Sequence, residues 1–195
     1  MKVIALTALA AAAGLATANP IQAGQFAGNT VDTAGTPTSS IVIDISGFQG
    51  FDAQGSGLND ILSVFIGVGA EVTGIAWDVN LTTFGGSWAS ESVMNFGGQV
   101  FLTPGSADSF GVTNQNYNSG GVIDLSDNGI PNTLPDAGGN LEIEFFESFV
   151  DNAGAGDSIW EAGSTVTLVG TNIVPAPGAL AMLGLGGLVA GRRRR

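Results

Sequence analysis

A regular spacing of oxygen-bearing side chains marks the stretch D-L-S-D-N-G, which begins at Asp124. Asp124, Ser126 and Asn128 alternate as the ligands of calcium loops do, and the glycine that follows permits the sharp turn such loops require. The position that normally supplies a bidentate carboxylate is Pro135, with Asp136 one residue later. Asp124, Ser126, Asn128 and Asp136 are therefore the candidate Ca²⁺ ligands. A type I turn stabilised by Asx side chains explains the same residues without a metal.

Aromatic side chains are the second group that could bind a ligand, because flat apolar rings pack against the faces of sugars. Trp88 follows the turn signal Gly85-Gly86-Ser87, which favours an exposed position. Trp88 is therefore the candidate carbohydrate contact. For the remaining large aromatics with a polar group we expect packing in the core: Trp77, Trp160 and Tyr117.

The residue types of the chain leave few forms of catalysis open. The sequence has no His and no Cys, so it cannot assemble a Ser-His-Asp or Cys-His nucleophile system or the usual zinc ligands. Carboxylate pairs remain, as in glycosidases, but Glu142 and Glu144 share the polar face of an alternating strand, which is expected to face solvent. We expect no catalytic residue and no enzymatic activity.

Opposite charges occupy different parts of the chain. All 17 acidic residues lie between Asp32 and Glu161, without a single Lys, Arg or His among them. Nucleic acid binding requires cations that neutralise phosphates, so this composition excludes it. The mutual repulsion of the carboxylates must be relieved by salt or by bound cations, which fits a saline habitat or a calcium-rich matrix. The five basic residues lie at the ends of the chain: Lys2, Arg192, Arg193, Arg194 and Arg195.

The C-terminal segment 174–195 combines a proline signal, a glycine-rich apolar stretch and a terminal arginine cluster. As a helix, Ala176–Gly191 would span roughly 24 Å, against roughly 30 Å for the hydrocarbon core of a bilayer. Arginines stay at the cytoplasmic face of a membrane. We therefore expect a marginal transmembrane helix that suits transient retention, with Arg192–Arg195 on the cytoplasmic side and the main domain outside.

This three-part order, together with an N-terminal signal peptide, resembles the PEP-CTERM sorting signal of exported bacterial proteins. The residues that carry the resemblance are Val174, Pro175, Ala176, Pro177 and Gly178, followed by the apolar stretch and the arginines. Ala176 stands where that family usually has a glutamate, so the motif is a V-P-A-P variant. The resemblance implies that an exosortase-type enzyme recognises and cleaves the tail. The tail is also similar in part to a rhomboid-type Gly-Gly signal, but in that signal the glycine pair normally precedes the apolar segment, whereas Gly186 and Gly187 lie inside it.

The N-terminus predicts a signal peptide. Lys2 supplies a positive charge, Val3–Leu15 forms the apolar region, and small residues then offer cleavage after Ala18 or after Ala23. We take Ala23 as the boundary. The expected organisation is a signal peptide helix at 1–23, a single domain at 24–173 and the sorting signal with its transmembrane helix at 174–195.

The central domain is predicted to be all-β, because β-branched and alternating stretches recur between Gly- and Asn-rich turns and no helical period appears. Their spacing favours an antiparallel β-sandwich that is jelly-roll-like. Ile61–Val68 is continuously apolar and predicts a central strand buried on both faces. In Glu71–Val79 we expect Ile75, Trp77 and Val79 to point inward and Asp78 outward. The predicted strands are Ile41–Ile45, Ile61–Val68, Glu71–Val79, Ser92–Phe96, Gln99–Thr103, Ser109–Thr113, Gly121–Leu125, Leu141–Val150 and Thr165–Val169.

These expectations describe an exported, non-enzymatic structural or adhesive protein of the cell surface or extracellular matrix, held briefly at the membrane by its tail. Its expected partners are an exosortase-type enzyme and extracellular polysaccharide. No cofactor other than Ca²⁺ is predicted. Two alternatives stay open: a calcium-dependent carbohydrate-binding module and a secreted carbohydrate-active hydrolase.

Overall fold

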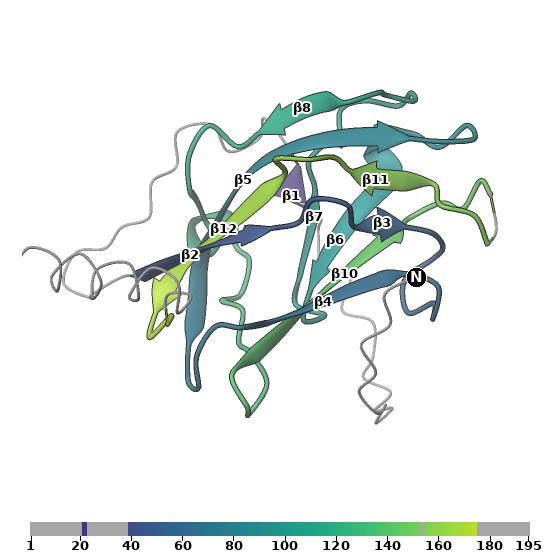
Figure 1. Ribbon diagram of the computed structural model, residues 1–195. Helices are drawn as coiled ribbons and strands as arrows, with labels where there is room; N and C mark the ends of the chain where they lie inside the picture. The colour runs from purple at the N-terminus through teal and green to yellow at the C-terminus, as the bar shows by residue number, and fades with distance from the viewer. Residues whose placement is uncertain (1–20, 23–38, 153, 175–195) are drawn as a thin grey trace, which may run out of the picture.

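The computed structural model describes residues 21–22, 39–152 and 154–174, and the regular elements of these residues are β-strands joined by turns and loops, with very little helix (Figure 1). Two single turns of 3₁₀ helix, η1 (Ala89–Glu91) and η2 (Ser126–Asn128), are the helical elements of this part of the chain. The prediction of an all-β protein with antiparallel sheets is confirmed. The strands are β1 (Ile21–Gln22), β2 (Ser39–Asp44), β3 (Gln49–Gly50), β4 (Asp60–Phe65), β5 (Glu71–Thr83), β6 (Ser92–Phe96), β7 (Val100–Thr103), β8 (Gln115–Asn118), β9 (Ile123–Asp124), β10 (Asn140–Glu147), β11 (Ser158–Trp160) and β12 (Thr165–Thr171).

One sheet contains five strands in the order β1-β7-β6-β10-β4. Strand β10 pairs with two antiparallel neighbours, so that Phe145 lies opposite Met94 of β6 and Asp60 of β4. Strand β1 is the exception to the antiparallel pattern, since Ile21 and Gln22 run parallel to β7. The sheet therefore joins the first described residues to the middle of the chain.

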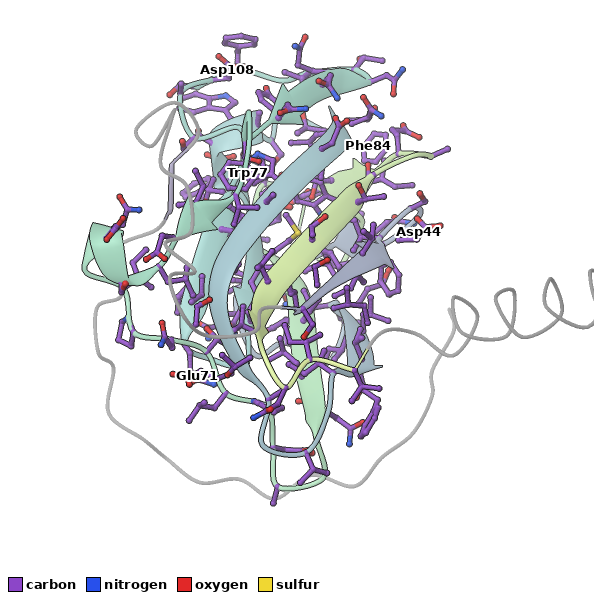
Figure 2. All side chains as sticks on the ribbon, turned by 90° about the vertical axis from the view of Figure 1, so that its left-hand side faces the viewer. Asp44, Glu71, Trp77, Phe84 and Asp108 are labelled. Carbon is purple, nitrogen blue, oxygen red and sulfur yellow. The ribbon has the colours of Figure 1, made fainter. Side chains whose placement is uncertain are left out.

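The second sheet contains seven strands, with β2-β12-β5-β11-β3 as its main path and β8 and β9 paired to β5. The long strand β5 organises this sheet because it pairs with β12, β11, β8 and β9. Figure 2 shows Glu71 and Phe84, near the two ends of β5, toward opposite ends of the molecule. The loops before and after β5 therefore lie at opposite ends of the molecule.

Apolar side chains from both sheets form one buried cluster. Alternate residues of a strand point to opposite faces, so β5, β10 and β12 send every second side chain into this cluster along much of their length. Phe145 of β10 stacks on Phe48 at a centroid separation of 4.8 Å and lies 6.5 Å from the ring of Trp160 on β11. These aromatic contacts connect the two sheets at the core.

Strand β5 has the predicted alternation. Ile75, Trp77 and Val79 are buried and Asp78 is exposed. The expected core position is also confirmed for Trp160, which is fully buried. Tyr117 is only half-buried against the core, because its hydroxyl donates a hydrogen bond of 2.7 Å to Asp108.

The prediction that Ile61–Val68 is a central strand buried on both faces is wrong. Strand β4 is the last strand of its sheet, and the side chains alternate between half-buried and exposed. Ile61 and Phe65 are 56% and 52% exposed, whereas Leu62 and Val64 pack against the core. An apolar run cannot distinguish a central strand from an edge strand, because sheet position depends on pairing with distant segments.

The prediction of a strand at Ser109–Thr113 is wrong, since no strand lies among the described residues between β7, which ends at Thr103, and β8, which begins at Gln115. The backbone of Val112 instead bonds to the end of β5: the Thr83 amide donates to its carbonyl and its own amide donates to the Thr83 hydroxyl, both at 3.0 Å. This segment therefore packs as a loop beside the end of β5.

Folded structure continues to the first residue of the sorting motif. Ile173 is buried, and the amide of Val174 donates a 2.9 Å hydrogen bond to the carbonyl of Ile66. Within residues 21–22, 39–152 and 154–174 no helix is long and apolar enough to cross a membrane. The predicted signal peptide helix and transmembrane helix lie outside the described residues, as do Pro175, Ala176, Pro177, Gly178 and Arg192–Arg195.

Candidate functional site

Trp88 lies at the end of the molecule where β5 stops and β6 begins. After β5, the Ser87 amide donates a 2.9 Å hydrogen bond to the Phe84 carbonyl and closes a turn. The next residue, Trp88, is 45% exposed, as its position after a glycine pair indicated. Its amide donates a 2.8 Å hydrogen bond to Oε2 of Glu91, so its backbone is held in place while its ring faces solvent.

Two further loops bring exposed aromatic rings to this end of the molecule. The Ala89 amide donates a 3.0 Å hydrogen bond to the Phe110 carbonyl, and the Ser148 amide donates one of 2.8 Å to the Glu91 carbonyl. Phe110 and Phe149, which follows Ser148, are 55% and 61% exposed. These main-chain hydrogen bonds hold the segments together at one end of the molecule, and we call the four exposed aromatic residues on them the aromatic end: Phe84, Trp88, Phe110 and Phe149.

A buried carboxyl group lies beneath the aromatic end. Glu147, the last residue of β10, is fully buried. Its Oε2 accepts hydrogen bonds from the hydroxyls of Ser87 at 3.3 Å and Ser92 at 3.4 Å, and its Oε1 accepts one from the hydroxyl of Ser158. These serines belong to the turn after β5 and to strands β6 and β11, so one carboxyl group joins both sheets.

Burial raises the pKa of Glu147 to about 7, because the charged form loses its hydration. The negative charge of Asp157 raises this pKa further, while the hydrogen bonds from Ser158, Ser87 and Ser92 lower it. No Lys, Arg or His lies between Val3 and Gly191 to balance the charge. Glu147 therefore titrates near neutral pH instead of staying ionised like an ordinary glutamate.

Asp157 is also fully buried, and it closes the loop between β10 and β11. Its Oδ2 accepts a 3.1 Å hydrogen bond from the Asp151 amide, and its Oδ1 accepts one of 2.9 Å from the side-chain amide of Asn152. Its backbone carbonyl accepts a 2.8 Å hydrogen bond from Phe84. Asp157 thus connects this loop to the turn that carries Phe84.

Gly85 lies where the side chain of Asn152 from a neighbouring loop comes close to the backbone. A Cβ atom at Gly85 would lie 1.7 Å from Nδ2 of Asn152, and the φ angle of +65° also disfavours other residues. The glycine pair before Trp88 therefore both turns the chain and allows the neighbouring loop to pack against it.

The candidate calcium residues form a compact turn. Oδ1 of Asp124 accepts hydrogen bonds from the hydroxyl of Ser126 at 2.7 Å and from the amide of Asp127 at 2.9 Å. The side-chain amide of Asn128 donates to the carbonyl of Asp124 at 2.6 Å. This is the Asx-stabilised turn that explained the sequence without a metal.

Asp136, the fourth candidate ligand, belongs to a different turn, which precedes β10. Its Oδ1 accepts a 2.8 Å hydrogen bond from the Asn140 amide. That bond is the main reason that the pKa of Asp136 lies below its usual value. Among the described residues, no group of three or more His, Cys, Asp or Glu side chains is arranged to hold a metal ion.

Glu142 and Glu144, the pair expected on a solvent-exposed face, have different environments. Glu142 is exposed, whereas Glu144 is half-buried. Oε1 of Glu144 accepts hydrogen bonds from the Gly55 amide at 2.6 Å and from the Asn59 side chain at 2.9 Å. Glu144 therefore ties the loop before β4 to β10.

A shallow hollow with a volume of about 380 Å³ lies beside the Asp136 turn, and its walls include Asp136 and Glu142. A glycosidase needs one carboxyl group with a raised pKa to protonate the leaving oxygen. The pKa of Asp136 is lowered, which is unsuited to that role. The two fully buried carboxyl groups, Glu147 and Asp157, hold loops together and lie away from solvent.

Comparisons of the chain with family models, with curated proteins and with solved structures gave no match. The aromatic end is therefore the feature of the molecule from which a function can be inferred. Sequence reasoning identified Trp88 there but missed Phe84, Phe110 and Phe149, although each is an aromatic residue in a stretch with turn signals. It also missed Glu147, which follows the break in the alternation of β10 at Phe146.

Proposed function

We propose that this chain is a non-enzymatic, exported protein of the bacterial cell surface or extracellular matrix, with a structural or adhesive role. Its two sheets would form a jelly-roll-like β-sandwich that presents the aromatic end outward. The observation that carries this proposal is that the exposed aromatic rings gather over carboxyl groups that hold the loops together. An adhesive surface needs exposed apolar rings on a stable support, whereas a hydrolase needs accessible carboxyl groups.

The sorting signal fits the proposed location. The amide of Val174 is bonded to the carbonyl of Ile66, and the motif residues Pro175, Ala176, Pro177 and Gly178 come directly after it in the sequence. An exosortase-type enzyme acting at this motif would therefore release the domain without cutting into a strand. The cluster Arg192–Arg195 would stop transfer at the cytoplasmic leaflet.

Fractionation of cells that produce the full chain tests this role. We expect the mature protein in the outer or extracellular fraction, with a mass that shows loss of the tail. Replacing Arg192–Arg195 with serines, or both Pro175 and Pro177 with alanines, should leave an unprocessed form at the membrane. Recovery of the intact chain in the cytosol would contradict the proposal.

The two candidate cleavage sites of the signal peptide have different consequences for the fold. Cleavage after Ala18 keeps β1, which pairs with Leu102 and Thr103 of β7, whereas cleavage after Ala23 removes it. The pairing therefore favours Ala18, in place of the boundary at Ala23 expected from the sequence. N-terminal sequencing of the exported protein distinguishes a mature chain that begins at Asn19 from one that begins at Gly24.

A calcium-dependent carbohydrate-binding module is the second candidate, and it depends on Asp124, Ser126, Asn128 and Asp136. The carboxylate of Asp124 already accepts two hydrogen bonds within its own turn, so calcium would have to replace them. Loss of carbohydrate binding after addition of a chelator would favour this second function over the first.

A further inference from the structure

We propose that the aromatic end is a docking surface for an uncharged polysaccharide, and that docking needs no calcium. This inference rests on the proposed function, which places the domain where extracellular polysaccharide occurs. It adds the residues that make the contact and the chemical class of the ligand.

The distribution of exposed aromatic rings is uneven over the described residues. Five aromatic side chains are strongly exposed, and four of them belong to the aromatic end. The fifth is Phe65 on the edge strand β4. Aromatic rings in water are unfavourable for a monomer, and a cluster drawn from separate loops indicates a contact surface.

The loops that carry these rings are held by hydrogen bonds within the protein. The turn at Phe84 is bonded to the Asp157 carbonyl at 2.8 Å, and the segment after Trp88 is bonded to Phe110 at 3.0 Å. Figure 2 shows Phe84 and Asp108 toward the same end of the molecule, and the Ser90 amide donates a 3.1 Å hydrogen bond to the Asp108 carbonyl. A surface ordered in advance loses little conformational entropy on binding.

The negative charge of the protein favours an uncharged ligand. From Val3 to Gly191 the chain carries acidic side chains and no Lys, Arg or His, so nucleic acids, acidic polysaccharides and anionic bilayers are repelled. Uncharged sugars combine apolar ring faces, which pack on Trp88 and the phenylalanines, with hydroxyl donors. The exposed Asp151 follows Phe149 in the loop between β10 and β11 and supplies carboxylate acceptors for those hydroxyls.

The carboxyl groups beneath the surface already have partners from the protein. Glu147 accepts hydrogen bonds from three serine hydroxyls, Glu91 accepts one from the Trp88 amide, and Asp157 accepts one from the Asn152 side chain. The aromatic end is thus ordered by its own hydrogen bonds. Calcium is not needed to shape it, in contrast to a calcium-dependent lectin site.

Affinity electrophoresis of the full chain provides the test, with a neutral glucan and a neutral mannan as probes and alginate as the anionic polysaccharide. We expect retardation by at least one neutral glycan, unchanged by a chelator, and none by alginate. Trp88→Ala should weaken binding about tenfold, the loss expected for one well-packed aromatic contact. Phe65→Ala is the matched control, since it removes an exposed ring elsewhere and should leave binding unchanged.

Three results would overturn this inference: no retardation by either neutral glycan, equal losses in Trp88→Ala and Phe65→Ala, or binding abolished by the chelator. Binding to phosphatidylcholine vesicles and the oligomeric state in solution are measured as well, to test for the other two possible occupants. Trp88-dependent binding to vesicles, or Trp88-dependent dimerisation, would assign the surface to a membrane or to a second copy. Correct sorting with no glycan binding would remove this inference and leave the proposed location intact.

Discussion

Glu147 and Asp136 carry the same functional group in two contrasting parts of the molecule. Asp136 is exposed, accepts a hydrogen bond from the Asn140 amide and has a lowered pKa. Glu147 is fully buried, accepts hydrogen bonds from serine hydroxyls and has a pKa raised to about 7. In a domain without basic residues, a carboxylate near backbone amides and water stays ionised. A carboxyl group in the interior is pushed toward its neutral form.

This contrast shows how a purely acidic domain can tolerate an acid in its interior. The charge is avoided by protonation, since no cation is available to balance it. The serines around Glu147 accept or donate a hydrogen bond by rotating their hydroxyls. They therefore suit both protonation states, and the loops above remain connected in each.

Removal of the Glu147 side chain should have the largest effect. Glu147→Ala leaves a cavity and deprives the hydroxyls of Ser92 and Ser158 of their acceptor, whereas Ser87 keeps Glu91, so we expect unfolding to become about 4 kcal/mol easier. Asp136→Ala, in an exposed turn, should cost clearly less. Urea unfolding of both variants checks this order, and equal losses would contradict the assigned difference in burial.

The pH dependence of stability should follow from the raised pKa of Glu147. Because this pKa rises from 4.5 to about 7 on folding, its contribution to stability is complete below pH 4.5 and is lost as the pH rises to about 7. The loss amounts to about 3 kcal/mol. For Asp136 the sign is reversed, since its lowered pKa contributes stability that disappears only in strong acid.

Glu147→Gln isolates this effect from the repulsion among the other carboxylates. The variant should be more stable than the original chain at pH 8 and should show a flatter stability profile between pH 5 and pH 7. Thermal unfolding at constant ionic strength over this range provides the measurement. Identical profiles for both proteins would show that Glu147 is ionised in the folded state.

A smaller effect is expected from Gly85→Ala, which disturbs the packing between the turn before Trp88 and the loop at Asn152. The positive φ angle and the close approach should together cost about 1.5 kcal/mol, and glycan binding should weaken because Trp88 moves. Gly57→Ala is the control, because nothing lies within 4 Å of a Cβ atom at Gly57. Unfolding and affinity electrophoresis of the two variants test the prediction.

Calcium should have the smallest effect. The turn at Asp124 is already closed by its own hydrogen bonds, so millimolar CaCl₂ should raise the melting temperature no more than NaCl of equal ionic strength. Asp124→Asn is the matched variant. A calcium-specific increase that this substitution abolishes would restore the metal site and weaken the contrast between exposed and buried carboxyl groups.

Local sequence features predicted the strands well where alternation was strong. In β5 the inward set Ile75, Trp77 and Val79 is buried as expected. Ser92–Phe96 also matches β6, although this strand is buried at every position and does not alternate. The prediction was wrong for Ile61–Val68, where an apolar run gave no information on sheet position. The exposure of Trp88 followed from the glycine pair before it. The exposure of Phe110 could not be predicted, because the sequence around it, Ser109–Thr113, resembles a strand.

By itself, the sequence determined the all-β character of this protein, its turns and the absence of basic residues from its centre. These are properties of residue type and local spacing. Only the tertiary structure decided that Glu147 is buried beside Asp157, and that Phe84, Trp88, Phe110 and Phe149 share one end of the molecule. Burial and proximity arise from pairing between segments far apart in the chain, and no local pattern encodes which segments will meet.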